Sequence, residues 1–230
     1  MSPELDDLLC ARYPVLFRDR HADMRESGMC WGFSCGDGWY TLIDTLSGEL
    51  QRHAEATDTP ITAVQVKEKF GTLRMYVRPT DDYIQALQEI ADYFSAEICE
   101  LCGAPGHLIE SIWMRTLCAE HAADHPVVTR RVIIEPDPSR KIEEPIFRLP
   151  PIATPGWQHL CRALDKCIDN EVRHNNMPPI AVTDIRSTPP AVDWQGGDGA
   201  GGRAQAFYNL FLAYAMRVDR ETGKPLEVPK

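Results

Sequence analysis

The sequence predicts an α+β fold in which two related helix–β-hairpin–helix units flank a zinc finger that resembles a treble clef. Three observations predict it. An apolar pattern typical of helices recurs 118 to 120 residues later, a β-branched hairpin pattern recurs with it, and a cluster of Cys and His lies between the two copies. The 230 residues are enough for one domain or two modest ones.

The first recurring element is a helix. The stretch GDGWYTLIDTLSGEL (36–50) corresponds to TPGWQHLCRALDKCI (154–168), with Trp39 and Trp157 118 positions apart. The other matching positions are Leu42 with Leu160, Ile43 with Cys161, Leu46 with Leu164, and Leu50 with Ile168. Apolar residues at these spacings form one face of a helix.

The second recurring element is a strand pair. TPITAVQVK (59–67) matches PPIAVTDIR (178–186) at an offset of 119, and both stretches are rich in β-branched residues. FGTLRMYV follows the first stretch, with Gly71 at or near a turn, and PPAVDW is the weaker counterpart in the second copy. Each copy is therefore expected to form a β-hairpin.

The third recurring element is another helix, at an offset of 120. Its apolar stripe consists of Leu87, Ile90, Ala91, Phe94 and Ile98, which align with Phe207, Leu210, Phe211, Tyr214 and Val218. The turn after it recurs too, because Gly103 and Pro105 align with Gly223 and Pro225. The small drift of the offset favours an internal duplication over two units that share only generic patterning.

These elements divide the chain into four parts. Residues 1–35 are expected to form an N-terminal helix over 3–15, with Ser2 as its N-cap, followed by a loop. Residues 36–125 hold the first α+β unit and the zinc finger. Residues 126–151 form a Pro-rich connector with a short strand at RRVIIE, and 152–230 form the second unit, which lacks zinc ligands.

Charge and composition narrow the function classes. The formal net charge of −10 argues against nonspecific binding to phosphate backbones, which requires clustered Lys and Arg. The N-terminus has acidic residues where a secretory signal is basic, and the longest apolar stretch, AQAFYNLFLAYAM, falls short of the roughly 20 residues that span a bilayer. A cytoplasmic protein is expected, in which eight cysteines indicate metal binding or buried thiols rather than disulfides.

Four residues have the spacing of a zinc site. Cys99-x2-Cys102 is followed after fifteen residues by Cys118-x2-His121. Thiolate and imidazole ligands suit Zn²⁺, and two such pairs can meet at one ion. HLIES and WMRTLC are expected to pair as a hairpin, and CAEH to begin a helix that carries both last ligands on one face. A knuckle, a hairpin and a helix in this order resemble a treble clef.

The ligand set predicts a structural ion. Four protein ligands fill a tetrahedral shell and leave no position for a catalytic water. Buried reduced thiols and a surface histidine are the alternative explanation, and His107 or His125 could replace His121. In the second copy Asp219 and Thr222 stand opposite Cys99 and Cys102, so that turn is expected to be held by its core instead of a metal.

The motifs together resemble a known group. GDGW, KEKFGTLR, ICELCGAPG and WMRTLCAEH resemble poorly characterised bacterial and phage-borne proteins that share GDGW, KEKFG-LR and C-x-x-CG-x-PG patterns. The resemblance covers roughly residues 30–125. It implies a zinc-bearing module from a mobile-element setting and no particular reaction.

The leading hypothesis is a noncatalytic protein-binding module with an unidentified protein partner, such as an inhibitor of a host defence system or an immunity protein against a toxin. The acidic charge and the closed zinc site are its basis, and no catalytic or other cofactor-binding residue is assigned. Cys30 or Cys35 with His21 or His53 could form a nucleophile and its base, but a structural role is favoured.

Two alternatives remain. One is a hydrolase or nuclease that uses carboxylates between the two units. The other is a nucleic-acid-binding regulator in which Arg115, Arg130 and Arg131 contact phosphates. The basic group Lys67, Lys69 and Arg74 is interpreted as a solvated strand face, with contact to an acidic partner as its alternative. The sequence determines neither the partner nor the oligomeric state.

Overall fold

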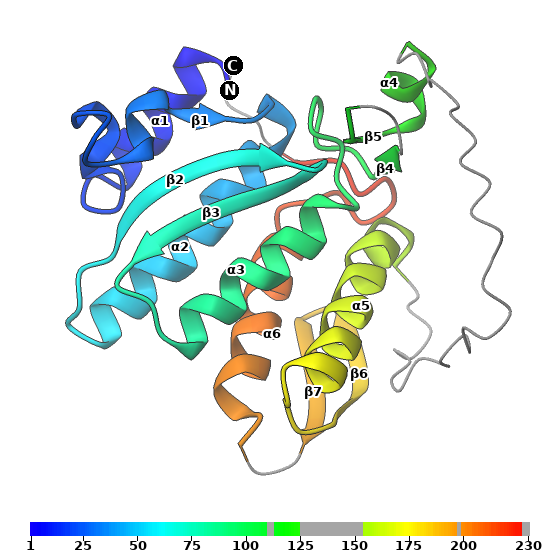
Figure 1. Ribbon diagram of the computed structural model, residues 1–230. Helices are drawn as coiled ribbons and strands as arrows, with labels where there is room; N and C mark the ends of the chain where they lie inside the picture. The colour runs from blue at the N-terminus through cyan, green and yellow to red at the C-terminus, as the bar shows by residue number, and fades with distance from the viewer. Residues whose placement is uncertain (110–112, 125–153, 197–198, 227–230) are drawn as a thin grey trace, which may run out of the picture.

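The computed structural model describes residues 1–109, 113–124, 154–196 and 199–226, and within them the protein is a mixed α+β structure (Figure 1). The connector 126–151 and its expected strand lie outside the described residues. None of the helices in the described part combines the length and apolarity that a bilayer-spanning helix needs.

The N-terminal part contains α1 (Pro3–Arg12) and β1 (Phe33–Ser34). Ser2 is the N-cap as predicted, although its side chain makes no capping hydrogen bond. The helix ends at Arg12, three residues before the predicted end, because Pro14 disfavours the helical conformation at Tyr13.

The first helix–hairpin–helix unit consists of α2 (Tyr40–Ala56), β2 (Thr62–Lys69), β3 (Thr72–Arg78) and α3 (Asp82–Ser95). β2 and β3 pair antiparallel, and β1 adds to β2 in parallel. Phe70 and Gly71 form the turn with φ of 56° and 78°, which is the left-handed geometry that suits a two-residue hairpin. The predicted position of Gly71 is confirmed.

The second helix–hairpin–helix unit consists of α5 (Gln158–His174), β6 (Ile180–Ser187), β7 (Pro190–Gly196) and α6 (Gly201–Ala215). Both α2 and α5 have 17 residues and follow a 3-10 turn that ends in Trp39 or Trp157. Because of these turns, α2 and α5 begin at Tyr40 and Gln158, a few residues after the starts of the predicted helical stretches 36–50 and 154–168. Both hairpins carry a bulge in their first strand, between Ala63 and Gln65 and between Val182 and Asp184.

The two units share one hydrophobic core. α3 packs against α5 and α6, α2 packs against α3 and α6, and Figure 1 shows α5 and α6 on the side of α3 that is away from the β2–β3 hairpin. Aromatic rings join the units at their centre, where Phe94 meets Phe211 edge to face at 6.4 Å between ring centroids and also meets Tyr214. The buried apolar residues of both units form one contiguous cluster. Neither unit therefore buries its helices alone.

Ion pairs of opposite polarity tie each unit to the other. Glu97, two residues after α3, accepts hydrogen bonds from Arg162 (3.0 Å) and Lys166 (2.7 Å) of α5. Arg217, two residues after α6, pairs with Asp44 of α2 at 2.6 Å. In the first contact the segment after α3 supplies the carboxylate and α5 supplies the cations. In the corresponding second contact the segment after α6 supplies the cation and α2 supplies the carboxylate. Both carboxylates are nearly buried, so each depends on its cations for compensation.

A second charged cluster lies where α3, α5 and α6 meet. Arg203 of α6 donates to the buried carboxylate of Glu171 from Nε at 3.0 Å, and it also pairs with Glu89 of α3. Burial, and after it the negative charge of Glu171, raise the pKa of Glu89 from 4.5 to about 7, although Arg203 opposes the shift. Glu89 is therefore protonated in the folded protein over a pH range where it is ionised in the unfolded chain.

This raised pKa predicts a pH dependence of stability. Between about pH 4.5 and pH 7 the folded state holds a proton on Glu89 that the unfolded state lacks. The contribution of this proton to the unfolding free energy is therefore present at low pH and is lost as the pH rises through 7. The unfolding free energy of the wild type should fall between pH 5 and pH 8. In Glu89→Gln this fall should be smaller than in the wild type by about 1 kcal/mol, after allowance for solvent screening. Urea denaturation at both pH values measures it. The exposed Glu55→Gln is the control, and parallel profiles for wild type and Glu89→Gln would contradict the prediction.

Candidate metal centre

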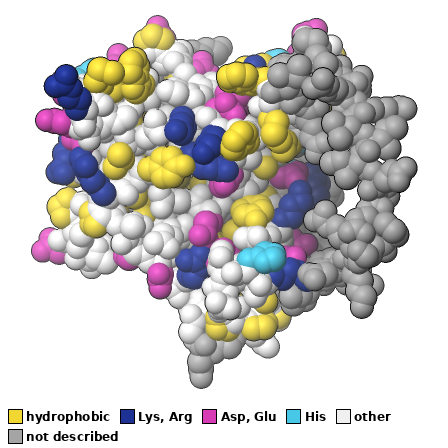
Figure 2. Space-filling view, in the orientation of Figure 1, with side chains coloured by type: hydrophobic (Ala, Val, Ile, Leu, Met, Phe, Trp, Pro, Cys, Tyr) yellow, Lys and Arg dark blue, Asp and Glu magenta, His cyan; other side chains and the backbone are white. Residues whose placement is uncertain are grey.

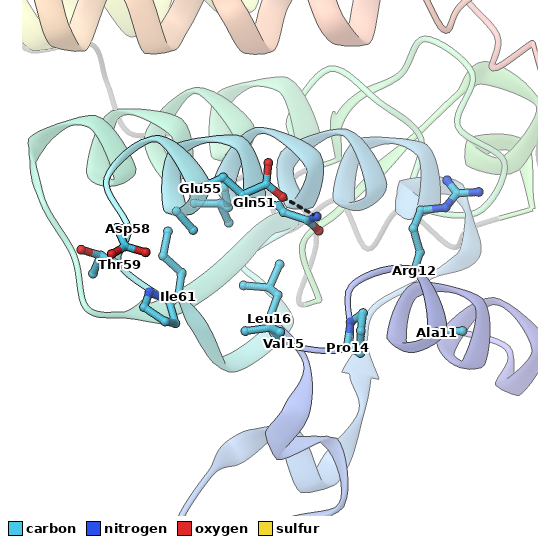
Figure 3. Close-up of a pocket in the computed structure, with 13 residues that line it drawn as sticks. Ala11, Arg12, Pro14, Val15, Leu16, Gln51, Glu55, Asp58, Thr59 and Ile61 are labelled. Carbon is cyan, nitrogen blue, oxygen red and sulfur yellow. Dashed lines mark hydrogen bonds between the residues drawn. The ribbon is translucent and has the colours of Figure 1, made fainter.

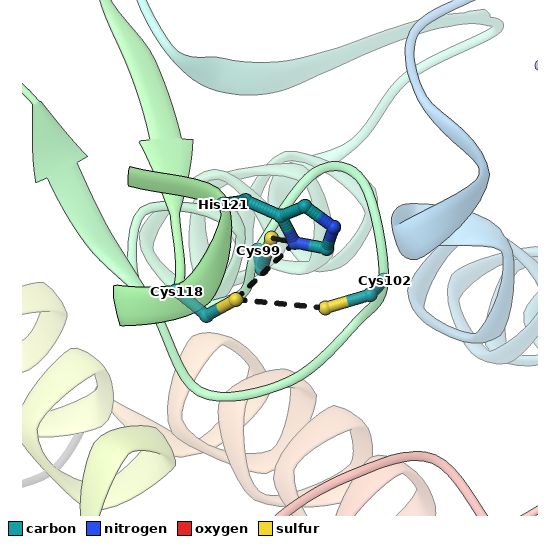
Figure 4. Close-up of side chains that lie close together, drawn as sticks. All are labelled: Cys99, Cys102, Cys118 and His121. Carbon is teal, nitrogen blue, oxygen red and sulfur yellow. Dashed lines mark hydrogen bonds between the residues drawn. The ribbon is translucent and has the colours of Figure 1, made fainter. Parts of the chain in front are cut away.

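The four predicted ligands meet at one point. The ligand atoms of Cys99, Cys102, Cys118 and His121 all lie within 4.8 Å of one another. Figure 4 shows the four side chains pointing toward one another. Cys99 and Cys102 come from the turn after α3, residues 98–106, which is called the knuckle. Cys118 is the N-cap of the short helix α4 (Ala119–Ala123), and His121 lies in its first turn, so both reach the cluster from one helix end. His107 is the first residue of strand β4 (His107–Ile109) and lies outside this cluster, and His125 lies outside the described residues.

The spacing of the donor atoms fits a tetrahedral metal. The sulfurs of Cys102 and Cys118 are 3.8 Å apart, and Nδ1 of His121 lies 3.4 Å from the sulfur of Cys99 and 3.2 Å from that of Cys118. Zinc–sulfur bonds of about 2.3 Å at a tetrahedral angle would separate two sulfurs by about 3.8 Å. His121 therefore presents Nδ1 to the centre, and the three sulfurs complete the set.

The protein also favours the thiolate form at one ligand. Burial alone would raise the pKa of Cys118, but hydrogen bonds from the backbone N–H and the ring of His121, together with the neighbouring sulfurs, lower it from 9.0 to about 7. The position of Cys118 at a helix N-terminus is typical of such lowered thiol pKa values. A metal ion would meet this sulfur in the charged form that it requires.

The hairpin of the finger forms as predicted. β4 (His107–Ile109) pairs antiparallel with β5 (Arg115–Leu117). Thr116 of β5 is fully buried, and its Oγ1 donates to the carbonyl of Gly71 at 2.7 Å. A Cβ atom at Gly71 would collide with Leu108 of β4. The finger therefore holds the tip of the β2–β3 hairpin, which connects the metal centre to the KEKFGTLR motif.

Glu100, between the two knuckle cysteines, joins three segments. Its Oε1 accepts from the N–H of Gly36 at 3.0 Å and its Oε2 accepts from Arg115 of β5 at 3.1 Å. Its backbone carbonyl accepts from Gly38 at 2.8 Å, and its N–H donates to Thr116 at 2.9 Å. The indole of Trp39 donates to Ile98 beside them. The GDGW motif is thus the docking segment for the knuckle, a role the sequence did not reveal.

The second unit holds the corresponding turn without a metal. Asp219, opposite Cys99, accepts at Oδ1 from the backbone N–H of Thr222 at 2.8 Å and of Glu221 at 3.1 Å. These hydrogen bonds, from Thr222 first, lower the pKa of Asp219. Core packing is present at this turn, where Val218 is buried, and the carboxylate of Asp219 adds hydrogen bonds to two N–H groups at the position that corresponds to Cys99.

The two turns also contact each other. Gly103 and Gly223 both have a positive φ, of 75° and 71°. A Cβ atom at Gly103 would lie 2.7 Å from Pro225, and one at Gly223 would lie 2.8 Å from Pro105. Only glycine allows this reciprocal approach, so the knuckle is packed against the C-terminal turn as well as the first unit.

Other candidate groups do not converge on a reaction site. Cys35 is buried, and burial raises the pKa of its thiol to about 12, which removes it as a nucleophile. His53 pairs with Asp81 at 2.7 Å and stacks on Tyr83. Arg115, one proposed phosphate contact, is paired with Glu100, and the other two arginines of that proposal lie outside the described residues.

A groove of about 560 Å³ lies between the end of α1 and the C-terminal half of α2 (Figure 3). Its walls include Val15 and Leu16 on one side and Gln51 and Ile61 on the other. Gln51 is hydrogen-bonded to Glu55, and Arg12 at one end reaches Asp44. The groove offers apolar surface and no paired acid and base.

No protein-family model, curated protein or solved structure matches this chain. The functional argument therefore depends on the geometry of the metal centre and of the surfaces that it supports.

Removing one ligand should remove the metal. We expect Cys102→Ser to lose bound zinc and to lower the melting temperature by about 10 °C, because a structural zinc contributes several kcal/mol to folding. Elemental analysis after gel filtration and calorimetry measure both effects. Cys30→Ser, which lies outside the cluster, is the control. A variant that keeps one equivalent of zinc would refute the site.

Replacing Glu100 should weaken the fold without removing a ligand. In Glu100→Gln an amide N–H₂ must face the N–H of Gly36 or the guanidinium of Arg115, so one buried donor loses its acceptor. We expect a loss of about 1–3 kcal/mol in urea unfolding, with zinc still bound. The exposed Glu26→Gln should change nothing, and equal stability of the two variants would contradict the assigned role.

Proposed function

We propose that this chain is a noncatalytic protein-binding module in which a structural zinc ion holds the β2–β3 hairpin as a recognition surface. The observation that carries the proposal is the hydrogen bond from Thr116 of the finger to Gly71 at the hairpin tip. This hydrogen bond connects the four-ligand centre, which leaves no position for a substrate, to the exposed face of the β2–β3 hairpin. The finger is thus a support for the surface rather than a reaction centre.

Zinc is the metal that the donor set favours. Three thiolates and an imidazole at tetrahedral spacing suit Zn²⁺, whereas Mg²⁺ and Ca²⁺ prefer oxygen ligands. The order of knuckle, β4–β5 hairpin and α4 supports a finger of treble-clef type. Four protein ligands fill a tetrahedral shell and leave no position for a catalytic water, which favours a structural over a catalytic ion.

The two units are proposed to be an internal duplication. The equal lengths of α2 and α5 and of the paired strands, the two first-strand bulges and the reciprocal glycine–proline contacts support this origin. The isolated bridges Ile98–Pro105 and Val218–Pro225, 120 positions apart, add to it. In this account the first copy carries the metal and the recognition surface, and the second copy supplies the other half of the core.

The proposed recognition surface is the outer face of the β2–β3 hairpin. Phe70 and Tyr76 are 66% and 43% exposed, and Lys69 and Lys67 lie over their rings at 5.4 and 6.0 Å. Figure 2 shows Lys, Arg and hydrophobic side chains together over this hairpin. In the part of the chain that the structure describes, Arg74 is paired with Asp92, whereas neither lysine has an ion-pair partner.

The partner best suited to this surface is the acidic face of another protein. Exposed aromatic side chains beside unpaired cations are typical of protein interfaces and complement carboxylates. A long nucleic acid is less suitable, since the remaining surface of a chain with net charge −10 would repel phosphates. A role as an inhibitor or immunity protein in a mobile-element setting is the form of this proposal that the motif resemblance favours.

The enzyme alternative has weaker support. Glu89 and Glu171 do approach each other between the units, but Arg203 pairs with both carboxylates, so their charges are already compensated. The neighbouring hollow beside β3, of about 260 Å³, contains Glu89 and Asp92, and Asp92 is paired with Arg74. This arrangement is that of a charged contact between packed helices.

Affinity capture with matched variants tests the proposed surface. Zinc-loaded wild-type protein and the Lys224→Glu variant, whose exposed lysine lies on the second unit, should capture the same protein from a bacterial lysate. We expect Lys67→Glu/Lys69→Glu to weaken capture at least tenfold, or about 1.4 kcal/mol, because acidic side chains would then face an acidic partner. Isothermal titration with the identified protein gives the affinities.

Zinc content and circular dichroism should be the same for all three proteins, so that a loss of capture reports on the surface. Equal capture by the double variant and by Lys224→Glu would place the binding surface elsewhere. Capture of nucleic acid in place of protein would favour the regulator.

A further inference from the structure

The two hairpins differ in how the outer edge of their first strand is covered. In the first unit the N-terminal part of the chain covers the edge of β2 that faces away from β3. The carbonyl of Leu16 accepts from Ala63 at 2.7 Å, Ser27 donates to the carbonyl of Val64 at 3.2 Å, and β1 pairs with the strand at Val66 and Lys67.

The corresponding edge of β6 has no such cover. β6 and β7 form a two-stranded sheet, and no group in the described ranges bonds to the backbone of β6 on the side away from β7. The side chains along it are exposed, with Asp184 53% and Arg186 50% accessible. An open edge of this kind is a template for pairing with another strand.

We propose that β6 pairs with β6 of a second copy of this chain, antiparallel across a twofold axis at Ile185. The two hairpins then form one continuous four-stranded sheet, with β7 of each copy at its outer sides. A twofold axis at Ile185 brings Asp184 of each copy opposite Arg186 of the other. Two equivalent cross-strand ion pairs result, in addition to the backbone hydrogen bonds of the new ladder.

The charge pattern along the open edge of β6 favours a second copy of the chain as the partner and the register centred on Ile185. An axis at Asp184 would oppose two carboxylates, an axis at Arg186 would oppose two guanidinium groups, and parallel in-register pairing would produce both repulsions. Only the antiparallel register centred on Ile185 makes the edge complementary to itself. Within one chain Arg186 already pairs with Asp193 of β7 at 2.8 Å and lies 3.7 Å from Asp184, so its guanidinium is oriented along this exposed face.

This inference does not depend on the proposed function, because β6 belongs to the second unit and the Lys67 surface to the first. The dimer would leave the outer face of the β2–β3 hairpin free and would present two such faces per assembly. The Asp184→Arg variant should accordingly retain partner capture while losing self-association, so failure of one proposal can be told from failure of the other.

Sedimentation velocity of the zinc-loaded full chain over a dilution series tests the dimer. We expect a reversible dimer in the wild type, with dimerisation weakened about tenfold in Asp184→Arg, since each cross-strand ion pair becomes a repulsion between two arginines. Arg186→Asp should weaken it similarly by opposing two carboxylates. Glu55→Arg, an exposed carboxylate far along the chain in α2, is the matched control and should leave dimerisation unchanged.

The decisive sample is an equimolar mixture of Asp184→Arg and Arg186→Asp, one of them carrying a fluorophore. Across the proposed axis these two chains are again complementary at both positions, so a mixed dimer should form with nearly wild-type affinity, which also shows that both variants are folded. A wild type that stays monomeric at all concentrations would overturn the proposal and leave the edge to a foreign strand. A dimer insensitive to both single substitutions would overturn it as well, since a different interface must then join the copies.

Discussion

The structure depends most on the way the metal knuckle is attached to the rest of the first unit. Glu100 stands between two metal cysteines and binds the loop before α2 and the strand β5 at once. Its carboxylate is almost inaccessible to water, so the two donors that it accepts are needed to compensate its burial. Order in the knuckle is therefore coupled to the entry of α2 and to the tip of the β2–β3 hairpin.

The second unit meets the same requirement with different chemistry. Backbone N–H groups in a tight turn need acceptors, because an unpaired N–H group away from water is costly. In the first unit the sulfur of Cys102 in the knuckle receives a backbone hydrogen bond from Ala104, and Cys118 at the start of α4 receives one from His121. In the second unit the carboxylate of Asp219 receives such hydrogen bonds instead. The geometry of the turn itself therefore does not depend on the four clustered ligands, because the second unit forms the same turn without them.

The contrasts between the two units indicate where each contributes to function. Both have a hairpin packed beside two long helices, but among the described residues only the first has a finger bonded to the tip of its hairpin and a covered strand edge. The exposed rings of Phe70 and Tyr76, with a lysine over each, belong to the first unit, and the open edge with Asp184 and Arg186 belongs to the second. The shared core fixes the two units relative to each other, so both surfaces are carried on one rigid frame.

The sequence by itself determined the local elements and the ligand set. Helical and strand periodicities are set by burial on one side of each element, so the stripes through Phe94 and Tyr214 and the turn at Gly71 could be located without coordinates. The Cys and His spacings are short, and short-range geometry is what a sequence encodes most directly. Tertiary structure alone decided that GDGW docks on Glu100, that Thr116 holds Gly71, and that Arg217 and Glu97 exchange partners between units. These contacts join residues far apart in the chain, and their partners are chosen by the packing of whole helices and not by any local pattern.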